Sequence, residues 1–138
     1  MRKMSLDLGD KRIGIATSDL LGIIANPLET YTRGSITKDI NHIAELVKTH
    51  SVDCIVLGLP INMDGTEGER VEKSREFGRI LSENIPNIKI DYMDERWTTV
   101  SAEKMLIDAD VSREKRKTVI DKVAATIILQ SYLDKINK

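Results

Sequence analysis

Apolar and polar residues alternate along the first part of the chain, which is the pattern of short strands that bury one face. The alternation predicts strands over residues 3–8, over residues 13–18 and from residue 23 to about residue 31, joined by tight turns. The third strand is expected to bend at Pro27, because proline is tolerated in a sheet only at an edge or a bulge. Together these strands form an antiparallel meander.

The spacing of apolar residues then changes to that of a helix. Residues 40–47 carry apolar side chains at three- and four-residue intervals, and either Ser35 or Thr37 can cap this helix. A nearly continuous apolar run follows over residues 52–59. Such a run is typical of a strand that is buried on both faces.

The second half of the chain continues this alternation of helix and strand. It predicts a charged helix over residues 68–84, a fifth strand over residues 88–93, a short helix holding Ala102, Met105 and Leu106 with Thr98 or Thr99 as its cap, and a last helix through residues 119–128. A strand–helix–strand crossover is right-handed and joins parallel strands. We therefore predict an α/β fold in one domain over residues 1–138, with a mixed five-stranded sheet, three antiparallel strands followed by two parallel ones, and helices on both faces.

Composition and charge narrow the class of protein. The 138 residues suffice for one domain with a hydrophobic core, and 31% charged against 41% apolar residues is typical of a folded protein. The formal net charge of -1 gives no overall attraction for nucleic acid, so any such binding must come from local basic patches. The single cysteine, Cys54, excludes an internal disulfide, and no apolar run reaches the length of a membrane span. We therefore expect a cytoplasmic protein with no membrane partner.

One carboxylate, Asp7, stands in the first predicted strand and needs a compensating partner. Its neighbours Leu6 and Leu8 point to the opposite face, and a carboxylate beside an apolar core is costly without a cation, a hydrogen-bonding turn or a metal. Asp94 and Glu95 follow the fifth strand. Because ligands gather at the carboxyl ends of parallel strands, we expect Asp7 and one of these two acids to share a rim of the sheet.

A third carboxylate, Asp121, lies at the edge of the apolar surface of the last predicted helix. Carboxylates that converge repel one another unless divalent cations neutralise them, and oxygen ligands favour Mg²⁺ or Mn²⁺ over zinc. We therefore expect two such ions, which would activate a water and stabilise the leaving oxygen of a phosphodiester. Cys54 in its buried strand offers no competing chemistry, and His42 and His50 are expected at surface positions flanking the end of a helix.

Each acid at the expected rim also has a purely structural explanation. The triplet Asp94-Glu95-Arg96 can be a solvated turn with a local ion pair. Asp121 can be an acid early in a helix, stabilised by the helix dipole and by Lys117 and Lys122. The sequence leaves these alternatives open.

Basic residues near the expected rim are candidates for phosphate contacts. These are Lys11, Arg12, Arg70 and Arg96, which would position a nucleic acid without reading its sequence. The glycine-rich segment 62–68 is either a plain strand-to-helix connection or a loop whose N–H groups receive a phosphate. The basic run 113–117 is either the solvated start of a helix or a further phosphate contact.

Four segments, taken together and in this order, resemble one family. They are LDLGDKRIG at residues 6–14, GLP at 58–60 with NMDGTEG at 62–68, DERWTT at 94–99 and DKVAA at 121–125. The chain resembles the YqgF family, the RuvX-type proteins described as Holliday junction resolvases and as nucleases for the 5′ end of precursor 16S ribosomal RNA. The resemblance implies a ribonuclease H-like fold with Asp7, Glu95 and Asp121 as metal-binding catalytic acids, and it leaves open whether Asp94 takes the place of Glu95.

These observations favour a metal-dependent nuclease of structured RNA, with a ribosomal RNA precursor as the substrate and Mg²⁺ or Mn²⁺ as the cofactor. The alternatives are a Holliday junction resolvase with the same chemistry on four-way DNA, and a non-catalytic nucleic-acid-binding module. The near-neutral charge counts against the resolvase, which would need a basic dimer to cut two strands. A sugar-kinase or actin-like protein is disfavoured, because 138 residues leave no second domain to close over a nucleotide. The sequence does not decide between a monomer and a dimer.

Overall fold

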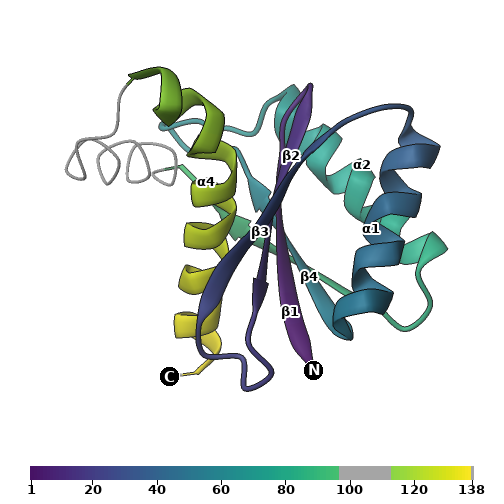
Figure 1. The fold of residues 1–138 in the computed structure, drawn as a ribbon. Helices are drawn as coiled ribbons and strands as arrows, with labels where there is room; N and C mark the ends of the chain where they lie inside the picture. Colours follow the sequence, from purple (N-terminus) through teal and green to yellow (C-terminus); the bar gives the residue numbers. More distant parts are fainter. Residues whose placement is uncertain (97–112, 138) are drawn as a thin grey trace.

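The computed structural model describes residues 1–96 and 113–137, and of residues 113–122 it describes the backbone alone. Figure 1 shows a central sheet with helices on either side. The strands are β1 (Arg2–Leu8), β2 (Arg12–Ser18), β3 (Ala25–Thr32), β4 (Val52–Leu59) and β5 (Lys89–Asp94), and the helices are α1 (Ile36–His50), α2 (Glu69–Asn84) and α4 (Arg113–Ile136). The predicted elements within the described residues are present. The ends of the five strands and of α2 differ from the prediction by at most two residues, whereas α4 extends well beyond the predicted residues 119–128 at both ends.

The five strands form one sheet in the order β3-β2-β1-β4-β5. β2 pairs with β1 and with β3 in antiparallel fashion, whereas β4 pairs with β1 and with β5 in parallel. The predicted mixed sheet is therefore confirmed. Because β1, β4 and β5 run in the same direction, their carboxyl ends meet along one rim.

The edge strand β3 contains the predicted irregularity at Pro27. The register passes from Ile15 opposite Glu29 to Ala16 opposite Pro27, so Leu28 is an extra residue that forms a bulge. Proline has no N–H to donate to a ladder, which confines it to such positions.

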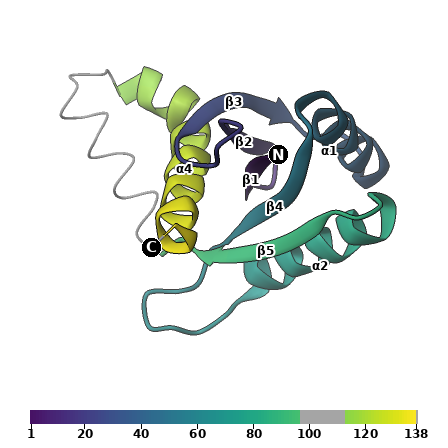
Figure 2. The same cartoon turned by 90° about the horizontal axis from the view of Figure 1, so that it is seen from below.

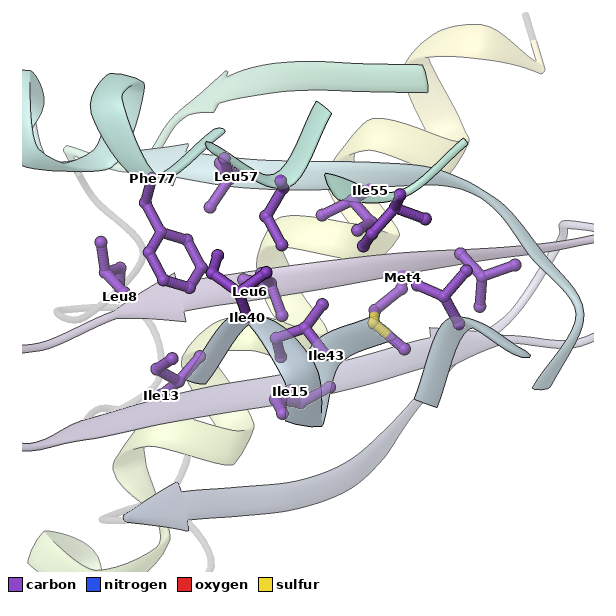
Figure 3. Close-up of a cluster of buried hydrophobic side chains, with 14 residues drawn as sticks. Met4, Leu6, Leu8, Ile13, Ile15, Ile40, Ile43, Ile55, Leu57 and Phe77 are labelled. Atoms are coloured by element: carbon purple, nitrogen blue, oxygen red, sulfur yellow. The ribbon is translucent and has the colours of Figure 1, made fainter. Parts of the chain in front are cut away.

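Each face of the sheet has its own apolar core. Met4, Leu6 and Leu8 of β1 point to the face that α1 and α2 cover, and Figure 3 shows them packed with Ile43 and Phe77. The opposite face packs against α4, as the view from below in Figure 2 makes clear. β4 contributes to both cores because its alternate side chains, Leu57 and Val56, point to opposite faces. This explains its continuous apolar sequence.

The helix boundaries decide one alternative that the sequence left open. Ser35, not Thr37, caps α1, with its Oγ accepting a hydrogen bond from the Lys38 backbone N–H at 3.2 Å. α4 begins at Arg113, so the basic run 113–117 belongs to its first turns. The short helix predicted around Ala102, Met105 and Leu106 lies outside the described residues. No helix in the described part of the chain has the length and apolarity needed to cross a bilayer.

The prediction for His42 is wrong. Instead of flanking the helix end at the surface, His42 lies within α1 and is half-buried. Its Nε2 lies 2.7 Å from Glu29 Oε1, and its ring stacks on Tyr31 with the centroids 4.1 Å apart. α1 contacts β3 here through His42, and helical spacing alone does not reveal this neighbour. Cys54 is 2% exposed, as its buried strand predicts.

Candidate active site

Asp7 lies near the carboxyl end of β1, on the face of the sheet that α4 covers. Its neighbours Leu6 and Leu8 are buried in the core on the other face, which confirms the predicted alternation. Leu6 pairs with Leu57 of the parallel strand β4, and the residues that follow them are Asp7 and Gly58. The residue of β4 next to Asp7 is therefore a glycine, which has no side chain.

Glu95 follows the last residue of β5 and occupies the space above Gly58. Its backbone N–H donates a hydrogen bond to the Leu59 carbonyl oxygen at 3.1 Å, which holds the chain at the rim as it leaves the sheet. A Cβ atom on Gly58 would overlap the Glu95 carboxylate and lie 2.7 Å from Ile128 Cδ1. The absence of a side chain at Gly58 is what lets the Glu95 carboxylate approach Asp7.

Asp7 and Glu95 form an interacting pair of carboxyl groups. Burial, the neighbouring charge of Asp7 and a hydrogen bond between the two side chains together raise the pKa of Glu95 to about 8, and the Arg70 charge only partly opposes this. Without a cation, the pair therefore keeps a proton near neutral pH, because two adjacent carboxylates in a partly desolvated site cannot both ionise at low cost.

Asp94 has a different role from its neighbour. It is exposed, and its Oδ2 accepts a hydrogen bond from Arg96 Nε at 2.9 Å and forms an ion pair with Nη2 at 2.8 Å. Its Oδ1 accepts a hydrogen bond from the Arg96 backbone N–H at 3.0 Å. The local ion pair considered for the 94–96 triplet thus exists, but Glu95 is outside it. The residue that faces Asp7 is Glu95.

Asp121 belongs to α4, and its side chain lies outside the described residues. The backbone of α4 nevertheless shows how far along the direction of β1 Asp121 lies. Ser5 Oγ donates a hydrogen bond to the Ala125 carbonyl oxygen at 2.6 Å, which joins β1 to α4. Further along α4, Gln130 binds the backbone of Ala25 at the opposite end of the sheet from the rim, so α4 runs antiparallel to β1.

Helix and strand rises then place two residues at the same level. Asp7 lies two residues beyond Ser5 along β1, and Asp121 lies four residues before Ala125 along α4, which is about 6 Å toward the rim in both cases. The backbone of Asp121 thus reaches the level of Asp7.

A cavity of about 470 Å³ opens beside the carboxyl pair. Its lining combines acidic, basic and apolar residues: Asp7, Gly9, Pro60, Ile61, Asn62, Met63, Arg70, Glu95 and Arg96. Of the predicted phosphate contacts, Arg70 and Arg96 line this cavity. Lys11 and Arg12 do not: Lys11 lies in the exposed turn between β1 and β2, and Arg12 is the exposed first residue of β2.

The chemistry of the carboxyl pair fits a hard divalent cation. Carboxylate oxygens are the ligands that Mg²⁺ and Mn²⁺ prefer, and a bound cation would relieve the repulsion that raises the pKa of Glu95. Within the residues whose side chains are described, no third His, Cys, Asp or Glu joins this pair. The predicted third ligand, Asp121, falls outside those residues.

Two features of the site were not predicted from the sequence. One is the role of Gly58, and the other is the hydrogen bond from Ser5 to α4. A glycine inside the apolar run 52–59 was the available signal for the first, because glycine in a strand interior often marks a close approach. A serine between Met4 and Leu6 was the corresponding signal for the second.

Comparison with known proteins relates this site to a family. A family model described as RuvX, Holliday junction resolvase, matches residues 1–135. A protein of Heliobacterium modesticaldum named "putative pre-16S rRNA nuclease" is 53% identical over 134 residues, which cover 97% of this chain and 89% of that protein. A protein of Halalkalibacterium halodurans with the same name is 54% identical over 137 residues, covering 98% of this chain and 97% of the relative.

Solved structures confirm the fold. The Holliday junction resolvase of fowlpox virus, in a complex with junction DNA, superposes with a TM-score of 0.64 at 14% identity, covering 100% of both chains. This likeness supports the ribonuclease H-like fold expected from the sequence. Since the family model spans nearly the whole chain and the two relatives described above exceed 50% identity, the protein belongs to the RuvX family.

Proposed function

We propose that the protein is a metal-dependent nuclease that hydrolyses phosphodiester bonds in structured RNA, with the 5′ end of precursor 16S ribosomal RNA as its substrate. The observation that carries this proposal is the pairing of Asp7 and Glu95 over Gly58, beside an open cavity that also contains Arg70. The names of the closely similar relatives support the choice of RNA. Such an activity would belong to ribosome biogenesis in the cytoplasm.

The acidic and the basic residues at the cavity have different parts in this proposal. Asp7 and Glu95, together with Asp121 from α4, would hold one or two Mg²⁺ or Mn²⁺ ions. Such ions, when bound, lower the pKa of a water and stabilise the leaving oxygen of a phosphodiester.

The guanidinium groups of the cavity serve the substrate. Arg70, in the first turn of α2, donates to the oxygens of the phosphate and balances its charge next to the acids. Arg96 is held in a fixed orientation by Asp94, so that it enters the cavity wall already ordered.

A second candidate is the resolution of four-way DNA junctions, which the description of the matching family favours. The chemistry at the carboxyl pair would be the same. The two candidates differ in the shape of the substrate and in the need for two active sites that act on one junction.

A parallel cleavage assay separates these functions. The purified protein is incubated with precursor 16S ribosomal RNA and with a four-way DNA junction, each in Mg²⁺, in Mn²⁺ and in EDTA. We expect cleavage of the RNA in either metal and none in EDTA. Cleavage of the junction alone would favour the second candidate, and cleavage of neither would leave a nucleic-acid-binding module.

The variant Asp7→Asn assigns any cleavage to this site. It keeps the shape of the side chain but removes one charge from the pair, so we expect cleavage to fall by at least about 100-fold, the size of effect seen when a transition-state charge partner is lost. The matched control is Asp10→Asn, an exposed acid in the following turn that does not line the cavity. Equal cleavage rates for Asp7→Asn and the wild type would refute the assignment.

A further inference from the structure

We infer that the site accepts a nucleotide whose base is unstacked, and that the Pro60–Met63 segment holds the face of that base next to the bond to be cut. This inference rests on the proposed function, and it narrows the substrate class to strands with an unpaired or displaced nucleotide at the cavity. It is drawn from the wall of the cavity formed by residues 60–63, which is mainly apolar, in contrast to the charged carboxyl pair.

The wall of the cavity formed by residues 60–63 is apolar except for Asn62, and it is accessible. Pro60, Ile61 and Met63 line the same cavity as Asp7 and Glu95. Met63 is 53% exposed, one of the few large apolar side chains that reach the surface in the described residues. An exposed apolar side chain within a charged cavity is a contact surface for a ligand that carries both kinds of group.

Hydrogen bonds inside the loop keep this wall in place. Asp64 Oδ1 accepts from the backbone N–H and from the hydroxyl of Thr66, at 2.9 and 2.6 Å. Asn62 donates from its side chain to Thr66 Oγ1 at 2.9 Å and from its backbone to the Thr66 carbonyl oxygen at 3.0 Å. The loop therefore uses its polar groups internally and leaves Met63 available for an outside contact.

The charges around this wall match the parts of a nucleotide. A phosphate would lie between the Asp7–Glu95 pair and Arg70. The flat, weakly polar face of a base would pack against the apolar wall and the guanidinium plane of Arg96, whose orientation is fixed by the ion pair with Asp94. A volume of about 470 Å³ lies within the range of sites for small ligands. A base inside a continuous duplex has both faces stacked on its neighbours and cannot make this contact. The substrate must therefore present an unstacked nucleotide.

Binding assays in EDTA test this inference without relying on cleavage. The probes are a fluorescein-labelled single-stranded RNA, the same RNA in a fully paired duplex, and the DNA counterparts of both. We expect the wild type to bind single strands more tightly than duplexes. Met63→Ala should weaken single-strand binding on the order of fivefold while changing duplex binding by less than about twofold, since the Met63 side chain buries apolar surface against the face of an unstacked base only.

Two further variants keep the result interpretable. Met63→Leu retains an apolar side chain of similar volume and should restore single-strand binding. Leu21→Ala removes a side chain that is 79% exposed but lies in the β2–β3 turn, away from the cavity, and should have no effect. Unchanged single-strand binding by Met63→Ala, or an equal loss for single strands and duplexes, would overturn the inference.

Failure of this inference and failure of the nuclease proposal give different results. A protein that shows this binding pattern but cleaves nothing keeps the base contact and loses the proposed function. A protein that cleaves RNA with no effect of Met63→Ala on single-strand binding keeps the function and loses the base contact. The RNA and DNA arms report which sugar the site prefers.

Discussion

Gly58 shows how one residue type controls the geometry of the candidate active site. It lies in the apolar run of β4, where a larger apolar residue would serve the core better by packing alone. Instead, the missing side chain leaves room for the Glu95 carboxylate and for Ile128 of α4. The carboxyl pair therefore depends on Gly58, which has no side chain and takes no direct part in the chemistry.

Gly58→Ala tests this dependence. A methyl group at this position would displace the Glu95 carboxylate and Ile128, so we expect weaker Mg²⁺ binding, slower cleavage and a loss of stability of about 1–3 kcal/mol from overpacking. Mg²⁺ titration and equilibrium unfolding in urea measure the two effects.

Gly34→Ala is the matched control, because a Cβ atom there would meet only the flexible side chain of Lys38, at 3.3 Å. If Gly58→Ala bound Mg²⁺ and unfolded like the wild type, the close approach at Gly58 would not matter.

At the level of elements, Arg33 ties the turn next to Asp7 to helix α1. Its Nη1 donates to the Gly9 carbonyl oxygen at 2.9 Å and its Nε donates to Asp39 Oδ2 at 2.9 Å, while its backbone N–H donates to the Lys11 carbonyl oxygen. The Asp39 side chain is fully buried. A buried ion pair of this kind fixes the turn between β1 and β2 relative to the helix layer.

Arg33→Ala should destabilise the protein by about 3 kcal/mol, because it leaves the buried Asp39 carboxylate without its cation. Urea unfolding measures this change. Arg79→Ala is the comparison: Arg79 pairs with Glu76 and Glu83 on the exposed face of α2, where solvent screens the charges, and little change is expected. Equal destabilisation by the two variants would show that burial does not set the strength of these pairs.

At the level of the whole molecule, the parallel order of three strands brings distant segments to one rim. Asp7 is the next-to-last residue of β1, Gly58 is the next-to-last residue of β4 and Glu95 follows β5. Helix α4 covers the same face and runs antiparallel to β1, with Gln130 fastened to Ile23 and Ala25 near the β2–β3 turn. Lys11, in the turn after Gly9, and Arg12, the first residue of β2, lie outside the cavity.

Replacing Lys11 and Arg12 together by alanine should weaken binding of RNA and make its salt dependence less steep. Each phosphate contact contributes to the slope of log K against log salt, so we expect the slope to fall in magnitude by about 1.5 for the two residues. Fluorescence anisotropy at several KCl concentrations measures the slope.

Lys135→Ala, at the far end of α4, serves as the control for this pair. An unchanged slope in the double variant would exclude the turn as a phosphate contact.

Local patterns in the sequence were sufficient for the elements and for part of the site. Alternation placed Asp7 on the face opposite Leu6 and Leu8, because side-chain direction in a strand follows from position alone. The unbroken apolar run of β4 predicted burial on both faces for the same reason. The order of strands and helices then implied that the carboxyl ends of the parallel strands share a rim.

Tertiary structure alone decided which side chains meet at that rim. The chain leaves β5 at Asp94, so no strand periodicity predicts whether Asp94 or Glu95 turns inward; the Arg96 ion pair and the space above Gly58 make that choice. In the same way, Arg70 lines the cavity and Lys11 and Arg12 do not, although all are basic residues near the rim. The physical reason is that periodicity reports which way a side chain points from its own element, whereas contacts between elements depend on how closely their backbones can approach.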